Sequence, residues 1–309
     1  MRDEANKFFD ENITHSLSNR QYKRDIKKFV AFCRGKGLRS LSDGKNLIVE
    51  YCDFLCKKNT YSASSIHTFL APVCRFYGVN MKDVYNKPKR LVSEYTKGRV
   101  PRTDRYRKYS DLSHPYWEKI LHLQMALGVR KSELGNLRGS DLHWEGKNCF
   151  VHVRRGKGGK SSDYLVMPKD IPLVTSYFEN KGPEEFIFDK KYIKNNDLNL
   201  HSLRAKHAQN FYFYLLDRIT KEPEFKKELS ELVIRKWQEQ NINPKTGKPK
   251  KFDYKNLYGW YYLRGGNKLK ALEYNKPTRY NRLCMCATSV LALAHFRLSI
   301  VPTYLVMYK

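Results

Sequence analysis

The sequence predicts a mainly α-helical fold with a small β-hairpin, divided into an N-terminal helical domain and a larger α+β domain. Apolar residues repeat at helical spacing over most of the chain, whereas one short stretch alternates at strand spacing beside a glycine-rich turn. With 309 residues, of which 41% are hydrophobic, the chain is long enough to bury two cores. This composition excludes a disordered basic tail, because such tails lack the apolar side chains needed to fold.

The first domain, residues 1–87, is predicted to consist of three or four short amphipathic helices. Ile26, Phe29 and Cys33 fall on one face of a helix, and Ser62 can cap a later one at its N-terminus. The opposite faces carry lysine and arginine. Such a bundle is equally compatible with a clamp for a polyanion and with an ordinary solvated surface.

Residues 88–108 are predicted to be a linker, since they contain two prolines and a glycine and show no periodicity. Eight basic side chains against two acidic ones favour a strap across a phosphate backbone over a merely soluble connection. The basic residues expected to contact phosphates are Lys89, Arg90, Arg99 and Arg102.

The second domain, residues 109–309, is predicted to begin with a helix that Gly128 ends, followed by another helix from about Arg130. Residues 148–153 and 164–167 alternate as two strands of a hairpin with a glycine-rich tip. A long helix is expected after His201.

Residues 221–282 look like an insertion, rich in basic residues and in aromatic ones. We expect this segment to fold as a subdomain that packs on the rest of the domain and extends its basic surface; the alternative is an arm that bridges two copies of the chain. Most of its clustered aromatic side chains are expected to be packed against something, because a floating loop should not expose so many. They are Tyr254, Tyr258, Trp260, Tyr261 and Tyr262.

The charge of the chain points to its partner. Lys and Arg number 59 against 31 Asp and Glu, a formal net charge of +28, which indicates a polyanionic partner, either nucleic acid or an anionic membrane. The apolar run from Val290 to Ala294 is far too short to cross a bilayer, and the first residues are too charged for a signal peptide, so no membrane partner is expected. Seven cysteines without metal-ligand spacing suggest reduced thiols and a cytosolic protein.

The sequence contains no complete motif for a nucleotide cofactor or a metal ion. The glycine-rich tip ends in Gly159-Lys160-Ser161, as a P-loop does, but Arg154 occupies the position of its first glycine. Acidic, histidine and cysteine residues also lack the spacing of metal ligands. No cofactor and no metal is therefore expected, and the remaining candidates for chemistry are basic residues and tyrosines.

Four motifs, in this order, resemble those of the tyrosine recombinases, the phage-integrase family. Residues 128–134, GVRKSEL, resemble the family's first arginine box, and residues 155–160, RGKGGK, its lysine-bearing hairpin. Residues 201–204, HSLR, match its second box. Finally, His295 followed by Tyr304 matches its last histidine and its nucleophile. The resemblance implies a helical core-binding domain that clamps DNA, followed by a recombinase-like catalytic domain.

The resemblance also implies the role of each site residue. Two arginines would clamp the non-bridging oxygens of a DNA phosphodiester, since guanidinium groups stay charged and donate two hydrogen bonds at once. Tyr304 would attack the phosphorus and form a 3′-phosphotyrosine, and a hairpin lysine would protonate the leaving oxygen. Lys157 is our choice for this lysine and Lys160, otherwise a DNA contact, is its competitor; Glu133 would orient Arg130. The implied catalytic set is Tyr304, Arg130, Arg204, His201, His295 and Lys157.

The favoured function is therefore site-specific recombination, integrative or excisive, by a phage or mobile-element enzyme that acts as a tetramer on paired sites. The resemblance implies that it acts in the cytoplasm of a bacterial or phage-infected cell. A DNA-binding regulator that keeps the fold without strand exchange is the alternative, and a type IB topoisomerase is a third possibility. Two features depart from most of the family: Arg204 and His295 are far apart in the sequence, and few residues follow Tyr304. Both bear on how copies of the chain assemble.

Overall fold

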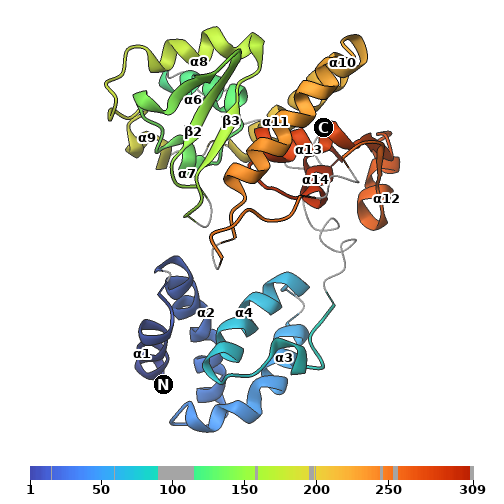
Figure 1. The fold of residues 1–309 in the computed structure, drawn as a ribbon. Coiled ribbons are helices and arrows are strands. Elements are labelled where there is room, and N and C mark those ends of the chain that lie inside the picture. Colours follow the sequence, from blue (N-terminus) through green and yellow to red (C-terminus); the bar gives the residue numbers. More distant parts are fainter. Residues whose placement is uncertain are drawn as a thin grey trace. The chain divides into compact units, whose positions relative to one another are not determined.

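A computed structural model describes residues 1–14, 16–58, 60–89, 115–156, 159–194, 198, 200–243, 246–252 and 257–306. The chain divides into two compact units, Met1–Gly98 and Arg99–Lys309 (Figure 1). Most of the described residues are helical, and the strands form two small antiparallel sheets. The predicted fold class, mainly α with a small sheet, is confirmed.

The first unit is a helical bundle, and its predicted helices are present. The Oγ of Ser62 accepts a hydrogen bond from the backbone N–H of Ser65, as expected of an N-terminal cap. An additional helix at the start of the chain buries Phe9, whose ring packs edge-on against those of Tyr22 and Phe76. The elements are α1 (Arg2–Asn12), α2 (Ser16–Gly35), η1 (Ser42–Leu47), α3 (Ile48–Lys57), α4 (Ala63–Phe76) and η2 (Met81–Asp83).

The second unit contains a three-stranded antiparallel sheet of order β1-β2-β3, built from β1 (Leu142–Glu145), β2 (Asn148–Val153) and β3 (Ser162–Leu165). The predicted strand 148–153 is confirmed. Its partner lies two residues earlier than predicted, because Ser162 pairs with Val153 and Tyr164 with Val151. Strand β1 was not expected, since its four residues are too few to show a period.

Two cores meet along the long helix α10 (Leu200–Lys221) of the second unit. Leu200 and Leu203 belong to a core shared with the sheet, whereas Ala208 and Phe211 belong to a core shared with the C-terminal elements. Figure 1 shows the two groups of elements on either side of the unit. The sheet side holds α6 (Pro115–Leu127), α7 (Lys131–Leu134), η4 (Gly139–Asp141), η6 (Pro168–Asp170), α8 (Ile171–Phe178) and α9 (Lys190–Lys194). The other side holds α11 (Phe225–Gln240), β4 (Trp260–Tyr262), α12 (Gly265–Glu273), β5 (Arg279–Asn281), α13 (Arg282–Ala287), η8 (Thr288–Ala292), η9 (Leu298–Ile300) and α14 (Val301–Val306).

The segment 221–282 packs on the rest of the second unit, as predicted. Its residues Phe225, Leu229 and Val233 are buried in the same core as α10 and α13. The expectation for its aromatic side chains is wrong for three of them. Tyr258, Trp260 and Tyr262 remain 52%, 48% and 60% exposed. Trp260 and Tyr262 belong to the two-stranded β4–β5 ribbon, which buries Tyr280 instead. Tyr261 is half-buried, and Tyr254 lies outside the described residues.

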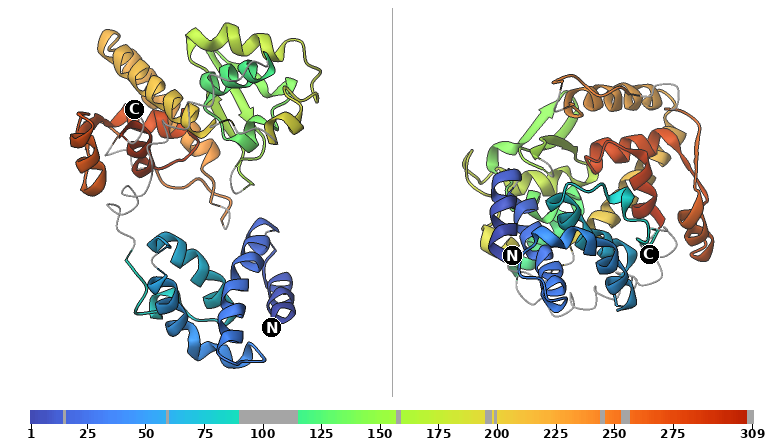
Figure 2. Two further views of the ribbon diagram at one scale, coloured as in Figure 1. Left: turned by 180° about the vertical axis from the view of Figure 1, so that it is seen from behind. Right: turned by 90° about the horizontal axis from the view of Figure 1, so that it is seen from below.

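Helix α11 lies beside the three-stranded sheet (Figure 2, right view) and is joined to it by ion pairs. The Nζ of Lys236, a side chain only 2% exposed, lies 2.5 Å from Oε1 of Glu145 and 2.9 Å from Oδ2 of Asp163. Asp163 also contacts Nδ1 of His152 at 2.6 Å. A buried lysine is tolerated here because two carboxylates compensate for its lost hydration.

These contacts shift the pKa values of the two residues paired on β2 and β3. Burial acts to raise the pKa of Asp163, but hydrogen bonds from His152 and Lys236 outweigh it and lower the pKa to about 2. The hydrogen bond to Asp163 raises the pKa of His152 above its ordinary value. Asp163 is therefore charged throughout the physiological range.

We expect Asp163→Asn to destabilise the chain at pH 7 and to do so progressively less in acid. The pKa of Asp163 is lower in the folded chain than its ordinary value of 3.8. Its contribution, ~2 kcal/mol, is thus fully present above pH 4 and is lost as the pH falls towards 2. Urea unfolding of both proteins between pH 7 and pH 2 measures the difference.

The control is Asp217→Asn, which removes an exposed helix pair with Lys221 and should change the free energy of unfolding by less than ~0.5 kcal/mol. A difference that does not depend on pH would contradict the assignment.

Candidate active site

Five of the predicted site residues lie together in the second unit. Arg130 immediately precedes α7, His201 and Arg204 are in the first turns of α10, His295 lies between η8 and η9, and Tyr304 is in α14. The site thus draws on elements far apart in the sequence, which meet because α10 packs against both α6 and α14.

Arg204 is the most deeply buried of these residues, with 1% of its surface exposed. Its Nη1 donates to the carbonyl of Gly128, and its Nη2 donates to the carbonyl of Leu293 at 2.5 Å. Burial acts to lower its pKa, but the neighbouring Tyr164 and Tyr304 outweigh this effect and raise it. Its Nε is buried and has no hydrogen-bond acceptor among the described residues. A buried donor of this kind is suited to an anionic ligand.

Arg130 is oriented by Glu133, as the sequence predicts. The Nη1 of Arg130 lies 2.5 Å from Oε1 of the buried Glu133, and its backbone N–H donates to Oε2 at 2.8 Å. The hydroxyl of Tyr164 donates to the same Oε2 at 3.0 Å. Burial acts to raise the pKa of Glu133, but the charge and hydrogen bonds of Arg130 lower it overall. The carboxylate is therefore ionised and keeps the guanidinium in place.

Tyr304 lies close to both histidines. Its Oη is 3.2 Å from Nε2 of His295, and its ring centroid is 5.8 Å from that of the exposed His201. The Arg204 guanidinium carbon lies 6.0 Å from the Tyr304 ring centroid. Only 5% of Tyr304 is exposed. A phenol beside an imidazole and an arginine has both a proton acceptor and a nearby positive charge.

The backbone around His295 is unusual. The preceding segment η8 is a π-helix, and Ala294 and Phe296, on either side of His295, have φ values of 45° and 53°. Such left-handed conformations cost about 1–2 kcal/mol each for residues with a Cβ. The Ser289 carbonyl accepts from the N–H of His295 at 2.9 Å, and the Ser289 Oγ accepts from the N–H of Arg297 at 3.0 Å. Ser289 therefore stabilises this turn.

A cavity of about 630 Å³ opens beside Arg130, His201 and Arg204. Lys131 and Lys190 also line it, so its wall is strongly basic. Its volume falls in the range of ordinary ligand sites. The cavity provides the space in which a phosphate group can reach both arginines.

The predicted hairpin lysines are only partly described. Lys157 lies outside the described residues, and Lys160 is half-buried. The backbone N–H of Gly156 donates to the Lys160 carbonyl at 2.6 Å. A Cβ on Gly156 would lie 2.9 Å from Oε1 of Glu133, so the base of the hairpin tip lies against the carboxylate that orients Arg130.

Of the predicted linker contacts, the structure describes one. Lys89 is exposed near the end of the described part of the first unit. Arg90, Arg99 and Arg102 lie outside the described residues.

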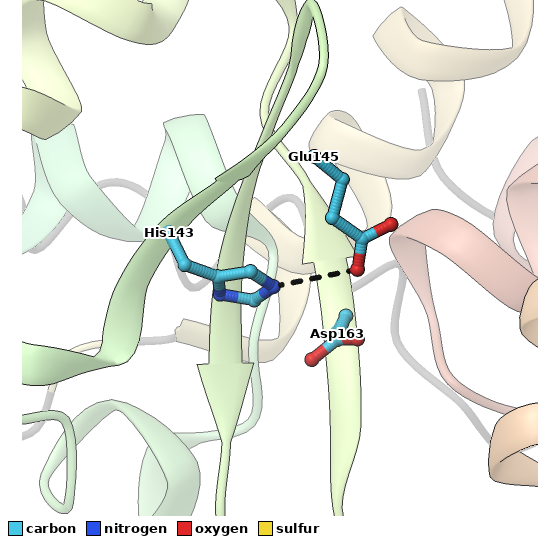
Figure 3. Close-up of side chains that lie close together, drawn as sticks. All are labelled: His143, Glu145 and Asp163. Carbon is cyan, nitrogen blue, oxygen red and sulfur yellow. Dashed lines mark ion pairs between the residues drawn. The ribbon is translucent and has the colours of Figure 1, made fainter.

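A second cluster contains residue types that bind metals, but a buried lysine already pairs with its carboxylates. His143, Glu145 and Asp163 place possible ligand atoms within 4.8 Å of one another (Figure 3). However, the ammonium group of Lys236 hydrogen-bonds to both carboxylates, and a metal cation beside it would be repelled. These residues do not fit a metal and form an ion-pair network instead.

Sequence reasoning missed several residues that support the site. Tyr164 was expected only as a strand residue, although a buried tyrosine hydroxyl generally finds a polar partner. The carbonyl groups of Gly128 and Leu293 carry no side-chain signal at all. Ser289 belongs to no motif of the sequence.

Comparisons with known proteins point to one family. No protein-family model matches the chain. A curated tyrosine recombinase from Thermosipho africanus (strain TCF52B) is 24% identical over 188 residues, which cover 56% of this chain. The chain spans 65% of the length of that relative. A crystal structure of XerA recombinase is 18% identical, covering 68% of this chain and 82% of the other, with a TM-score of 0.27, too low to bear on the fold. The similarity to tyrosine recombinases predicted from the motifs is confirmed by the curated relative.

Gly128, whose carbonyl holds Arg204, should tolerate no side chain. Its φ is +61°, and an added Cβ would lie 2.3 Å from Cδ2 of the buried His207. Gly128→Ala is expected to lower the free energy of unfolding by about 2–5 kcal/mol, combining backbone strain with a clash. Gly146→Ala is the matched control: φ is +57° and no atom lies within 4 Å, so about 1–2 kcal/mol of strain alone remains. Equal losses in urea unfolding would contradict the close packing of Gly128 on His207.

Proposed function

We propose that this chain is a site-specific DNA recombinase that cleaves and rejoins DNA through a 3′-phosphotyrosine intermediate. One observation supports this above all: the Tyr304 Oη lies 3.2 Å from His295 Nε2, and the Tyr304 ring lies close to His201 and Arg204, which line a basic cavity together with Arg130. Similarity to a tyrosine recombinase supports the class of reaction.

In this proposal the arginines bind the scissile phosphate. Arg204 uses one N–H of each Nη on backbone carbonyls, which leaves its Nε–H and the remaining Nη–H groups for phosphate oxygens. Arg130 is fixed by Glu133 and presents the rest of its guanidinium to the cavity. Because both groups are pre-oriented, they stabilise the charge that builds on the phosphorane without reorganising.

The chemical step is an in-line displacement. The phenolic oxygen of Tyr304 attacks the phosphorus while its proton passes to His295 in the tautomer with an unprotonated Nε2. The bond from phosphorus to the 5′-oxygen breaks, and a lysine ammonium of the hairpin, Lys157 or Lys160, supplies the proton for that oxygen. His201 adds a hydrogen bond to the phosphate. Rejoining reverses these transfers, so no cofactor is consumed.

The partner in this proposal is double-stranded DNA. The net charge of +28 gives a strong non-specific attraction to the phosphate backbone. The helical first unit would act as the core-binding clamp, with the linker residues Lys89, Arg90, Arg99 and Arg102 contacting phosphates. Recombination needs two cleaved duplexes, so we propose a tetramer on paired sites, as in a phage or mobile-element enzyme acting in the cytoplasm.

Tyr304→Phe should bind DNA as the wild-type chain does but form no covalent adduct. The substitution removes only the attacking oxygen and keeps the ring in its buried place. Incubation with a nicked duplex that carries the cognate site, followed by a denaturing gel, detects the adduct. Tyr308→Phe is the matched control, a nearby tyrosine outside the described residues, and should retain full adduct formation. If the adduct is lost in Tyr308→Phe instead, the nucleophile is misassigned.

The same experiment separates the two functions. A wild-type chain that binds its DNA site specifically yet forms no adduct on nicked substrate would favour the DNA-binding regulator. No observation of the described residues favours that alternative at present, because the arginines, histidines and tyrosine lie together.

Arg130→Lys should slow cleavage at least about 100-fold while changing DNA affinity less than about threefold. Lysine keeps the charge but lacks the planar pair of donors needed to stabilise the transition state. Single-turnover adduct formation and equilibrium binding measure the two quantities separately. Arg138→Lys is the control, since Arg138 pairs with the exposed Glu184 away from the cavity. Equal losses of binding and cleavage in Arg130→Lys would make Arg130 a binding residue only.

A further inference from the structure

Helix α11, part of the segment 221–282, forms ion pairs with the three-stranded sheet that contains the β2–β3 hairpin. The Nζ of the buried Lys236 pairs with Glu145 on β1 and with Asp163 on β3. It also lies 4.7 Å from the ring centroid of Phe150 on β2. One side chain of α11 therefore contacts all three strands.

Gln240, one turn further along α11, binds the same strand residue in two ways. Its Oε1 accepts from the backbone N–H of Asp163 at 3.2 Å, and its Nε2 donates to Oδ2 of Asp163 at 3.2 Å. Both the backbone and the side chain of Asp163 are thus fixed by α11. A sliding motion of β3 would break these contacts together with the ion pair to Lys236.

The opposite face of β3 reaches the active site. Successive residues of a strand point to opposite sides, and Tyr164, next to Asp163, donates its hydroxyl to Glu133. Glu133 in turn holds Arg130 and lies against Gly156 at the base of the hairpin tip. Arg130 is held by two contacts of its own with Glu133, so a shift of β3 would move the base of the hairpin tip relative to the arginine.

We propose that Lys236 is a positioning residue that holds the β2–β3 hairpin where its tip lysine can protonate the leaving 5′-oxygen. This rests on the proposed function, in which the bond from phosphorus to the 5′-oxygen breaks as that oxygen takes a proton from Lys157 or Lys160. Lys236 touches no reacting atom. It acts through Asp163, which anchors one strand of the hairpin.

A substrate whose leaving 5′-oxygen is replaced by sulfur tests this role directly. An alkyl thiol has a pKa near 8.5, so sulfur departs as a thiolate and needs no proton from the enzyme. Misplacing the tip lysine should slow cleavage of ordinary DNA and leave cleavage of the sulfur-containing DNA intact. A general loss of folding or of phosphate binding would slow both.

Lys236→Met should reduce the first-order rate of adduct formation on ordinary nicked DNA by about tenfold or more, since general acid catalysis typically contributes 10²–10⁴-fold. On the sulfur-containing duplex its rate should stay within about twofold of wild type. Gln240→Leu loosens Asp163 without leaving a buried charge unpaired, and it should show the same selectivity with a smaller loss. Lys147→Met removes an exposed pair between the β1–β2 turn and Glu228 of α11 and should leave both rates unchanged.

Equal losses on both substrates in Lys236→Met and Gln240→Leu would overturn the positioning role, and so would unchanged rates on both. Failure of the proposed function has a different signature. In that case the wild-type chain forms no adduct on either duplex, or Tyr304→Phe still forms it.

Discussion

The buried guanidinium of Arg204 connects the segments from which the site is built. It donates to the carbonyl of Gly128, where α6 ends, and to that of Leu293, where η8 ends. These two segments are separated by most of the second unit in sequence, and this side chain joins them. Burying an ion costs several kcal/mol unless the protein replaces its water, and here two carbonyls do so in part. The buried Nε, which has no acceptor among the described residues, is the part suited to a phosphate.

Two of the proposed catalytic residues are supported by partners that restrict their movement. Glu133 fixes Arg130, and Ser289 fixes the turn that carries His295. The left-handed conformations of Ala294 and Phe296 are strained, and such strain persists only where the surroundings impose the geometry. The π-helix before them shifts the register of the chain relative to an ordinary helix, so that His295 faces Tyr304. Preorganisation of this kind is what electrostatic catalysis requires, because donors already in place need not reorient as charge develops.

The segment 221–282 is an integral part of the second unit. Phe225, Leu229 and Val233 complete the core beneath α13, while Lys236 and Gln240 reach the sheet. Residues between the HSLR motif and His295 thus contribute both to the core of the unit and to the contacts that bind α11 to its sheet. The half-exposed Tyr258, Trp260 and Tyr262 lie on the β4–β5 part of this segment or next to it. Their exposure shows that aromatic content alone is a poor guide to burial at the edge of a small ribbon.

The sequence by itself determined the class of fold, the helix ended by Gly128, the capped helix after Ser62 and the strand 148–153. These features follow from local rules of periodicity and capping, which a single stretch of chain contains in full. Motif order also identified Arg130, His201, Arg204, His295 and Tyr304 as a candidate set. Only the tertiary structure decided that these five meet, that Tyr164 supports Glu133, and that Lys236 pairs with Asp163. Those contacts join residues remote in sequence, and backbone carbonyls such as that of Leu293 have no signature in a string of side chains. The burial of a lysine or an arginine depends on partners that arrive from elsewhere in the chain, and local pattern carries no information about them.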